Sequence, residues 1–311
     1  MEVLYFLERI RNPILNAFMS CVTELGGELV FLAAAIIIFW CIDKKCGYYM
    51  MTVGFSGIII NQFLKLWFRV PRPWVRDPNF TIVESARAAA TGYSFPSGHT
   101  QNVFAALGAP ARYWKIKWLR IVLVIGICLT ALSRMYLGVH TPADVGASCV
   151  IGAVLVFAVY PLFSHMEDRP GRIYALYVLF ILAAGAFVAF IYFYDFPADL
   201  DMNNYESALK HGWEIFFCSI GLLVVYHLDR TKMRFPVKAP LWAQIVKVVV
   251  GLSIILALKS LLKAPLLALF GGSAIAHGVR YGIVILFAGI LWPMTFPWFS
   301  KQKPLKHKEE E

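Results

Sequence analysis

Three short clusters of the sequence hold the residue types that phosphoryl transfer needs. The clusters are Lys65 with Arg72–Pro73, then Pro96–Ser97–Gly98–His99, then Ser133–Arg134 with His140 and Asp144. A phosphoryl transition state spreads negative charge over its equatorial oxygens, and positioned cations and backbone N–H groups stabilise that charge. In-line attack also needs a nucleophile and a proton donor on opposite sides of the phosphorus, roles that two histidines can fill. Without surplus carboxylates to hold two metal ions, these residues favour transfer through a covalent phosphohistidine.

The second cluster has the features of a helix N-terminus that binds phosphate. Ser97 suits the N-cap position, and Gly98 lets a ligand approach the backbone. Free N–H groups and the positive end of the helix dipole would then point at the anion. His99 in the first turn could reach the same anion. The alternative is a capped helix whose histidine only extends to the membrane surface.

The third cluster supplies a nucleophile and a group to orient it. Thr141, followed by proline, suits an N-cap, which puts Asp144 in the first turn of a helix near His140. A carboxylate bonded to Nδ1–H would fix the tautomer of the imidazole and leave Nε2 free to attack. Arg134 offers a planar fork that matches phosphate oxygens. The alternative is that Arg134 and Asp144 form only a buried ion pair.

The first cluster places a lysine at membrane depth. Lys65 lies at the end of an apolar segment, seven residues before Arg72. An ionisable residue inside the membrane is costly and indicates a functional site by default. The alternative is a lysine that extends its amine to the membrane surface from a helix end. The neighbouring Arg69 and Arg76 need do no more than meet lipid headgroups.

The elements that must position these clusters are membrane-spanning helices. The chain of 311 residues is 59% hydrophobic and 15% charged, with a mean hydropathy of +0.65. Soluble domains have roughly 45–50% apolar and about 25% charged residues. We therefore expect an all-α, polytopic transmembrane helical bundle. Segments of about 20 mainly apolar residues fall near 23–42, 47–67, 98–113, 119–137, 143–164, 174–194, 212–228, 241–262 and 279–298.

The first twenty residues favour an amphipathic helix lying at the membrane interface. Charged residues and Pro13 interrupt the apolar run, and no small-residue cleavage site follows, so a signal peptide is not expected. The net charge of +10 fits an anionic lipid surface better than nucleic acid, because the basic residues concentrate in loops. We expect the bilayer and a lipid phosphate as partners and no nucleic acid. The sequence carries no signal for the oligomeric state.

Alternate loops are basic, and this predicts the orientation of the bundle. Short loops rich in Lys and Arg favour the cytoplasm. These residues are Lys44, Lys45, Arg112, Lys115, Lys117, Arg120, Arg169, Arg172, Arg230, Lys232, Arg234, Lys238, Lys301, Lys303, Lys306 and Lys308. The opposite loop 195–211 instead carries Asp195, Asp199, Asp201 and Glu206 against Lys210 alone. The three clusters then all fall on the outer face of the membrane.

The clusters resemble the three signature motifs of the type 2 phosphatidic acid phosphatase superfamily: K-x6-R-P, P-S-G-H and S-R-x5-H-x3-D. The match is complete in order and spacing, from Lys65 to Pro73, from Pro96 to His99 and from Ser133 to Asp144. The resemblance implies a membrane phosphatase without metal or cofactor. It assigns His140 as nucleophile, Asp144 as its orienting partner and His99 as general acid. The residues that would hold the phosphate are Lys65, Arg72, Ser97, Gly98 and Arg134.

The resemblance covers residues 1–165, the expected phosphatase core, which contains every cluster. Residues 166–311 form an additional transmembrane helical bundle, without a comparable constellation, that the minimal family core lacks. Members of the family act on phosphatidate, phosphatidylglycerophosphate and undecaprenyl pyrophosphate, among other lipids, so either a phosphomonoester or a pyrophosphate is an expected substrate. A lipid phosphotransferase, or a transporter or binding protein built on the C-terminal bundle, is the alternative. The expected location is a bacterial inner membrane, with the active site outside.

Overall fold

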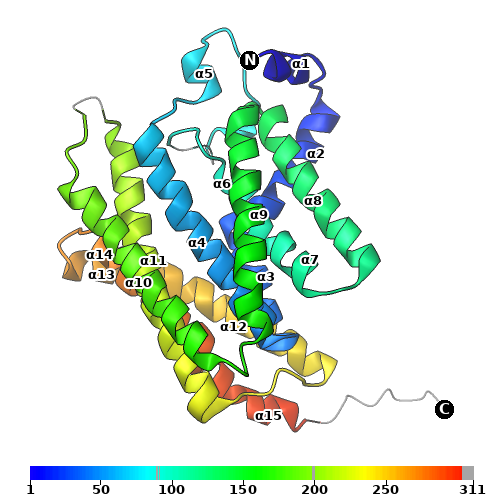
Figure 1. The fold of residues 1–311 in the computed structure, drawn as a ribbon, viewed down its shortest axis with the longest axis vertical. Coiled ribbons are helices and arrows are strands. Elements are labelled where there is room, and N and C mark those ends of the chain that lie inside the picture. The colour runs from blue at the N-terminus through cyan, green and yellow to red at the C-terminus, as the bar shows by residue number, and fades with distance from the viewer. Residues whose placement is uncertain (89, 91, 198–199, 303–311) are drawn as a thin grey trace.

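The computed structural model describes residues 1–88, 90, 92–197 and 200–302, which form an elongated bundle of helices (Figure 1). No β-strand occurs within that part of the chain, which confirms the predicted all-α fold. Some charged residues that contribute to the predicted orientation lie outside the described residues, namely Asp199, Lys303, Lys306 and Lys308.

In the first half of the chain the described residues form nine α-helices, with short 3-10 and π-helical turns between them. The α-helices are α1 (Glu2–Arg9), α2 (Pro13–Thr23), α3 (Glu28–Cys41), α4 (Lys44–Phe68), α5 (Pro73–Arg76), α6 (Gly98–Val103), α7 (Ala109–Tyr113), α8 (Lys117–Tyr136) and α9 (Pro142–Ser164). The 3-10 turns are η1 (Glu24–Gly26) and η2 (Glu84–Ala86), and the π-helical turn is η3 (Phe104–Gly108).

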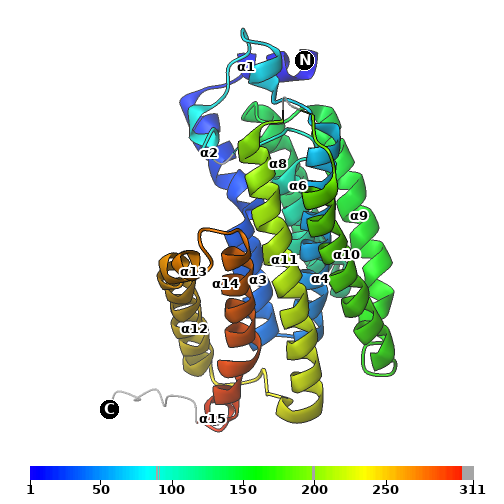
Figure 2. The same ribbon diagram turned by 90° about the vertical axis from the view of Figure 1, so that its left-hand side faces the viewer.

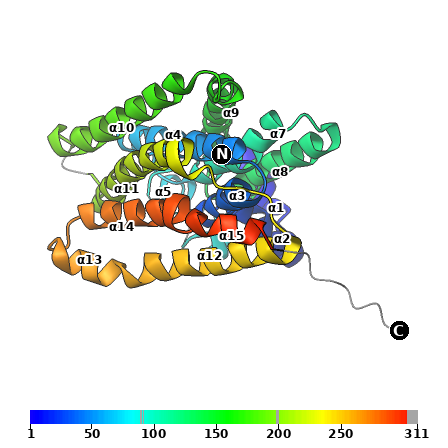
Figure 3. The ribbon, with the colours of Figure 1, turned by 90° about the horizontal axis from the view of Figure 1, so that it is seen from below.

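The second half is built of longer helices that run alongside the first. The α-helices are α10 (Pro170–Phe193), α11 (Met202–Leu228), α12 (Leu241–Leu261), α13 (Lys263–Leu269), α14 (Ile275–Leu286) and α15 (Phe296–Ser300). The π-helical turns η4 (Asp229–Met233) and η5 (Phe287–Leu291) extend α11 and α14, and a 3-10 turn, η6 (Pro293–Thr295), precedes α15. The helices α12 to α14 lie on the side of the bundle away from α9 and α10 (Figures 2 and 3), and α12 packs against α3.

The helix α4 is the central element of the bundle. Asp43 caps its N-terminus by accepting a hydrogen bond from the backbone N–H of Cys46 at 3.0 Å. Every residue from Cys46 to Phe55 is buried, because α4 packs against α3, α6, α9 and α11. The helix ends at Arg69, whose backbone takes the left-handed conformation with φ 48°. That turn carries the chain from Lys65, near the end of α4, towards Arg72.

Six helical segments are long and apolar enough to cross a membrane, and they match six of the nine predicted spans. They are α8, α9, α10, Met202–Met233, Leu241–Leu269 and Ile275–Ser300. The predicted span 23–42 corresponds to part of a helix pair, Pro13–Gly26 and Glu28–Cys41, which is bent by 51°. The predicted span 47–67 is helical but too polar to qualify, and neighbouring helices shield it. The predicted span 98–113 is divided among α6, η3 and α7.

The N-terminal segment is not the single amphipathic helix that the sequence suggests. It forms two helices, α1 and α2, with a break after Arg9. Pro13 opens the second helix, and Asn12 caps it by accepting a hydrogen bond from the backbone N–H of Leu15 at 3.0 Å. Proline lacks the N–H that would continue α1 through this point. The apolar side of α1 covers Phe80 in the loop that follows α5.

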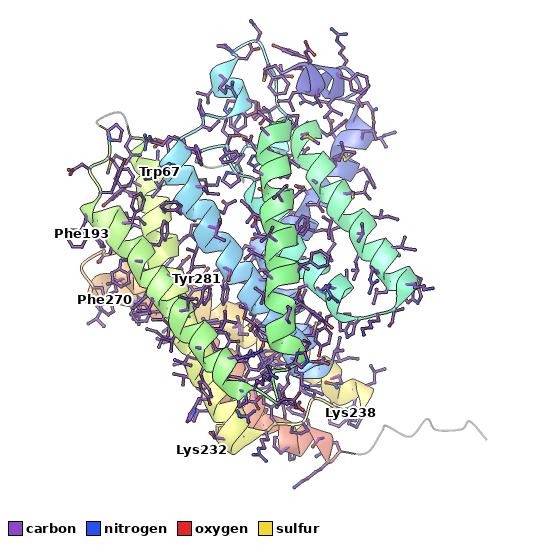
Figure 4. The ribbon with its side chains drawn as sticks, in the orientation of Figure 1. Trp67, Phe193, Lys232, Lys238, Phe270 and Tyr281 are labelled. Atoms are coloured by element: carbon purple, nitrogen blue, oxygen red, sulfur yellow. The ribbon has the colours of Figure 1, made fainter. Side chains whose placement is uncertain are left out.

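The two ends of the bundle differ in the elements that they present. The end of α4 and the starts of α6 and α9 lie at one end, together with α1 and α5 (Figure 1). Trp67 marks this end in Figure 4, whereas Lys232 and Lys238 lie at the opposite one. The three motif clusters and the basic segment that contains Lys232 and Lys238 therefore lie at opposite ends of the bundle.

Candidate active site

The structure brings the three clusters together around one cavity of about 190 Å³. Its lining includes residues from each cluster: Lys65, Arg72, Gly98, His99, Arg134 and His140. Ser97 and Asp144 are buried behind this lining. The three cations and the histidine of the first and third clusters come from α4, from α8 and from the loops that follow these two helices. The motif residues that line the cavity are therefore up to 75 residues apart in the chain, from Lys65 to His140.

The expected nucleophile, His140, faces a guanidinium. Its Nε2 lies 3.0 Å from Nη1 of Arg72, and the imidazole is almost fully buried. An arginine side chain only donates hydrogen bonds, so Nε2 accepts and the neutral imidazole carries its proton on Nδ1. This is the tautomer that a nucleophilic Nε2 requires.

The expected hydrogen bond between His140 and Asp144 is not formed in this structure. Nδ1 of His140 lies 3.7 Å from Oδ2 of Asp144, beyond hydrogen-bond distance. Within the described residues Nδ1 has no other hydrogen-bond partner. Oδ2 instead accepts hydrogen bonds from Ser94 Oγ at 2.6 Å and from the backbone N–H of Thr141 at 2.7 Å. These bonds fix the carboxylate in the first turn of α9, close behind the ring, and catalytic contacts of this kind often tighten only when substrate binds.

The backbone of residues 92–93 and of Val139 orients two cations of the cavity. Arg72 donates from Nε to the carbonyl of Gly92 and from Nη1 to the carbonyl of Val139, both at 2.8 Å. Lys65 donates from Nζ to the carbonyl of Tyr93 at 2.6 Å. Gly92 has φ +74°, and a Cβ there would lie 2.3 Å from Oδ1 of Asn204. Only glycine fits this position, because both the backbone conformation and the space exclude a side chain.

Burial and mutual repulsion set the charge states of the loop residues. Burial lowers the pKa of the Arg72 guanidinium to about 10, with the carboxylate of Asp144 opposing the shift. Arg72 is therefore still a cation at neutral pH. Burial also holds the pKa of His140 well below its ordinary value, and the charges of Arg72, Arg134 and Lys65 act in the same direction. The imidazole is therefore neutral at physiological pH and has a lone pair for attack.

The turn before α6 confirms the predicted N-cap. The Ser97 hydroxyl accepts from the backbone N–H of Thr100 at 3.4 Å and from the Thr100 hydroxyl at 2.9 Å. The backbone around Ser97 is held in place because its carbonyl accepts a hydrogen bond from Ser148 at 2.9 Å. A Cβ added at Gly98 would meet only Oδ1 of Asn61, at 3.9 Å. The glycine therefore leaves open space at the helix start, where a ligand can approach the backbone.

Arg134 does not form the ion pair with Asp144 that was its alternative role. Its Nη1 donates to the Thr23 hydroxyl at 2.6 Å, and the side chain is almost fully buried. Nε of Arg134 is buried without a hydrogen-bond partner among the described residues. A buried N–H group without a partner is costly, and an anion in the cavity that Arg134 lines would reduce that cost.

The sequence matches two family models in succession. The model of the PAP2 superfamily matches residues 46–168, and the model of the PAP2 superfamily phosphatase transmembrane extension matches residues 217–304. The chain is also 32% identical to the undecaprenyl-diphosphatase BcrC of Bacillus subtilis over 162 residues, which are 50% of this chain and 77% of that protein. The chain belongs to the PAP2 superfamily.

Other relatives in this superfamily are phosphatases with different substrates. Phosphatidylglycerophosphatase B of Bacillus subtilis is 31% identical over 164 residues, 48% of this chain and 76% of that protein. A lipid A 4'-phosphatase of Bacteroides thetaiotaomicron is 24% identical over 186 residues, 54% of this chain and 81% of that protein. No solved structure matches the chain. The PAP2 assignment confirms the resemblance drawn from the motifs, and this chain is an integral multi-pass membrane phosphatase.

The cavity contains side chains that the motifs did not reveal. Asn204, Ser207 and His211 of α11 line the same cavity, together with Glu28 at the start of α3. Asn204 Oδ1 accepts a hydrogen bond from the backbone N–H of Tyr93 at 2.8 Å. The prediction that residues 166–311 hold nothing comparable therefore overlooked their share in this cavity. The only sequence signal was the position of His211 beside the start of the predicted span 212–228, on the face that carries the motifs.

Proposed function

We propose that this phosphatase hydrolyses a phosphomonoester or diphosphate of a membrane lipid through a phosphohistidine on His140. The observation that supports it best is the position of His140, whose Nε2 faces Arg72 in a cavity that also holds Lys65, Arg134 and His99. The names of the relatives point to lipids with undecaprenyl diphosphate, phosphatidylglycerophosphate and lipid A headgroups as candidates.

In the first half of the reaction the phosphate binds to Lys65, Arg72 and Arg134. Its oxygens compete for the N–H of Arg72 that now faces Nε2 of His140, which releases the lone pair. Nε2 attacks phosphorus, so a P–N bond forms while the P–O bond to the lipid breaks. His99 donates a proton to the leaving oxygen. The imidazole gains positive charge, and the nearby Asp144 carboxylate stabilises it through Nδ1–H.

In the second half water replaces the lipid. His99, now without its proton, accepts one from the water as the oxygen attacks phosphorus. The P–N bond breaks, inorganic phosphate leaves, and His140 returns to its neutral form. Gly98 and the N–H groups at the start of α6 assist both steps, because the charge on the equatorial oxygens grows in each transition state.

The site lies at the outer face of a bacterial inner membrane in this proposal. Lys232 and Lys238 lie at the end of the bundle away from Trp67 (Figure 4), and short basic loops favour the cytoplasm. Residues 1–165 form the catalytic core and residues 166–311 form the additional bundle. The helix α11 belongs to the additional bundle but also lines the cavity of the core. A thiol-reactive reagent added to intact cells would label a cysteine introduced into the loop before α11 and not one introduced into the loop before α12.

Phosphate release by the purified protein in detergent with EDTA tests the reaction itself. The panel contains phosphatidate, phosphatidylglycerophosphate and undecaprenyl pyrophosphate, with His140→Ala alongside. We expect release of free phosphate from at least one lipid, and none from the variant. Release that needs a second lipid or sugar as acceptor would indicate a phosphotransferase instead. Rapid quenching with a radioactive phosphate label should leave the label on the wild-type protein and not on His140→Ala.

A further inference from the structure

A second cavity, of about 270 Å³, lies within the membrane-spanning part of the bundle, between α3 and α4 on one side and α11, α12 and α14 on the other. Figure 3 shows these helices side by side. The walls are mainly aliphatic, and they include Leu32, Ile36, Ile58, Ile215, Ile255 and Ile285. On α3 the lining positions Leu29, Leu32, Ala33 and Ile36 follow the spacing of one helix face. Water is disfavoured in a space with such walls.

This apolar cavity adjoins the phosphate cavity, which is the cavity of the candidate active site lined by Lys65, Arg72 and His140. Glu28 and His211 line both of them. A smaller cavity of about 70 Å³ lies at the junction, and its lining also includes Glu28 and His211. This junction shares Ile58 with the apolar cavity, and Asn61 and Gly98 with the phosphate cavity. A molecule whose phosphate lies beside Gly98 therefore has a neighbouring space for an attached chain.

His211 at the junction belongs to a cluster of paired polar side chains with Glu214 and Arg280. His211 Nδ1 lies 3.0 Å from Glu214 Oε2, and Glu214 Oε1 lies 3.9 Å from Nη2 of Arg280. Glu214 and Arg280 are both buried. Because this cluster neutralises its own charges, the transition from the cationic phosphate cavity to the aliphatic one is short. That sequence of environments matches an amphiphile with a phosphate, a polar linkage and a hydrocarbon chain.

The apolar cavity is also accessible from the bilayer. Leu29 of α3 and Leu256 of α12 line it, and their side chains are 57% and 54% exposed on the outside of the bundle. Its opening therefore lies between α3 and α12, within the hydrocarbon region. A chain entering here moves from one apolar environment to another, so transfer contributes little free energy. Shape, rather than hydrophobicity, would then decide which chain fits.

We propose that the apolar cavity holds the hydrocarbon chain attached to the scissile phosphate, and that α12 and α14 select the substrate by its chain. This inference rests on the proposed function, because the chain is that of the lipid whose phosphate His140 attacks. The helices α11, α12 and α14 thus form the tail-binding wall of the site rather than part of a separate domain. Tyr281 of α14, labelled in Figure 4, belongs to that wall.

The test compares a substitution that fills the apolar cavity with the same substitution at a position outside the cavity. Ala33→Phe adds an aromatic ring to the α3 wall. Ala257→Phe adds the same ring to an exposed position on the opposite side of α12 from the lining residues Leu252 and Ile255. Hexadecyl phosphate and hexyl phosphate serve as substrates that differ only in chain length. The full chain is assayed in detergent, and thermal unfolding is measured for each variant.

We expect Ala33→Phe to raise KM for hexadecyl phosphate about tenfold, the effect of roughly one overpacked side chain. Its KM for hexyl phosphate should change less than about twofold, and Ala257→Phe should change neither by more than that, as for a typical surface substitution. Equal effects of Ala33→Phe on both substrates, or none on either, would overturn the inference while the phosphatase activity stands. Wild-type protein that hydrolyses neither of these phosphates nor any panel lipid would refute the proposed function as well.

A second measurement covers the case in which Ala33→Phe does not fold. Wild-type protein is labelled with hexadecyl phosphate that carries a photoreactive diazirine at the end of its chain. We expect cross-links in peptides of α12 and α14 that excess unlabelled hexadecyl phosphate removes. Cross-links confined to α8 to α10, or insensitive to the competitor, would mean that only bulk bilayer lipid is being sampled.

Discussion

The motif segment and the helix α11 contribute to the same cavity in different ways. The motif segment supplies the cations Lys65, Arg72 and Arg134 and both histidines of the predicted mechanism. The helix α11 supplies the amide of Asn204, the hydroxyl of Ser207 and the imidazole of His211. The amide oxygen of Asn204 accepts a hydrogen bond from the backbone N–H of Tyr93. The first region therefore carries the groups that can react with phosphate. The second supports the loop that aims two of the cations, and it borders the space next to the phosphate.

This difference shows why one region is recognisable from short motifs and the other is not. Groups that meet a phosphoryl transition state must be cations or histidines at fixed spacing, because the charge to be stabilised has a fixed geometry. A supporting helix needs only one well-placed amide, for which many sequences would serve. Substitutions in the two regions should differ accordingly, with large effects on the chemical step in the first and smaller effects on positioning in the second.

The largest effect is expected from removing the nucleophile. His140→Ala should lower kcat by at least about 10⁴-fold, because loss of a nucleophile removes the covalent route altogether. Phosphate release in single-turnover assays measures it. His165→Ala, at an exposed position after α9, is the control and should retain wild-type activity. Substantial turnover by His140→Ala would require a different nucleophile in the motif segment.

The next largest effect tests whether Arg72 acts through the planar guanidinium group, which donates several hydrogen bonds at once, or through its charge alone. Arg72→Lys keeps the charge but cannot donate at once to the carbonyls of Gly92 and Val139. We expect kcat/KM to fall about 10²-fold, as for loss of one donor to a transition-state oxyanion. The exposed Arg76→Lys is the matched control. A loss of less than about threefold for Arg72→Lys would mean that charge alone suffices there.

A smaller effect is expected in α11, and it decides whether that helix belongs to the site. Asn204→Ala removes the acceptor for the backbone N–H of Tyr93, so the carbonyls that orient Lys65 and Arg72 become less fixed. We expect kcat/KM to fall about tenfold, the equivalent of one hydrogen bond of roughly 1.4 kcal/mol. Asn203→Ala, one residue earlier and exposed, should behave as wild type. Equal activity of both variants would restrict the site to the motif segment.

The smallest effect concerns pH. Attack needs neutral His140, and protonation abolishes it as pH falls through the pKa of that residue. Because burial and neighbouring cations hold this pKa well below its ordinary value, kcat/KM should not fall as pH is lowered through about 6.5, where an ordinary histidine titrates. Arg72→Gln removes one of those charges, so its acid limb should move to higher pH. An acid limb already at about 6.5 in wild type would show that His140 is not shielded as described.

Local contacts explain which parts of the site were predictable. The N-cap at Ser97 and the capping box of Thr141 and Asp144 each join residues three positions apart, so neighbouring residues decide them. Helix periods and apolar lengths likewise predicted α8 to α10 and the long helices that follow. The break between α1 and α2 was signalled by Asn12 and Pro13, but we interpreted the first twenty residues as one amphipathic helix.

By itself the sequence determined the reacting groups and the helices that carry them, because motif spacing and apolar length are properties of adjacent residues. The tertiary structure alone decided that α11 borders the phosphate cavity, since the bond between Tyr93 and Asn204 joins residues 111 positions apart. It also decided that Ser94 donates a hydrogen bond to Oδ2 of Asp144, the carboxylate oxygen that lies beside His140. Contacts of this kind depend on how whole helices pack, and no periodicity along the chain records that packing.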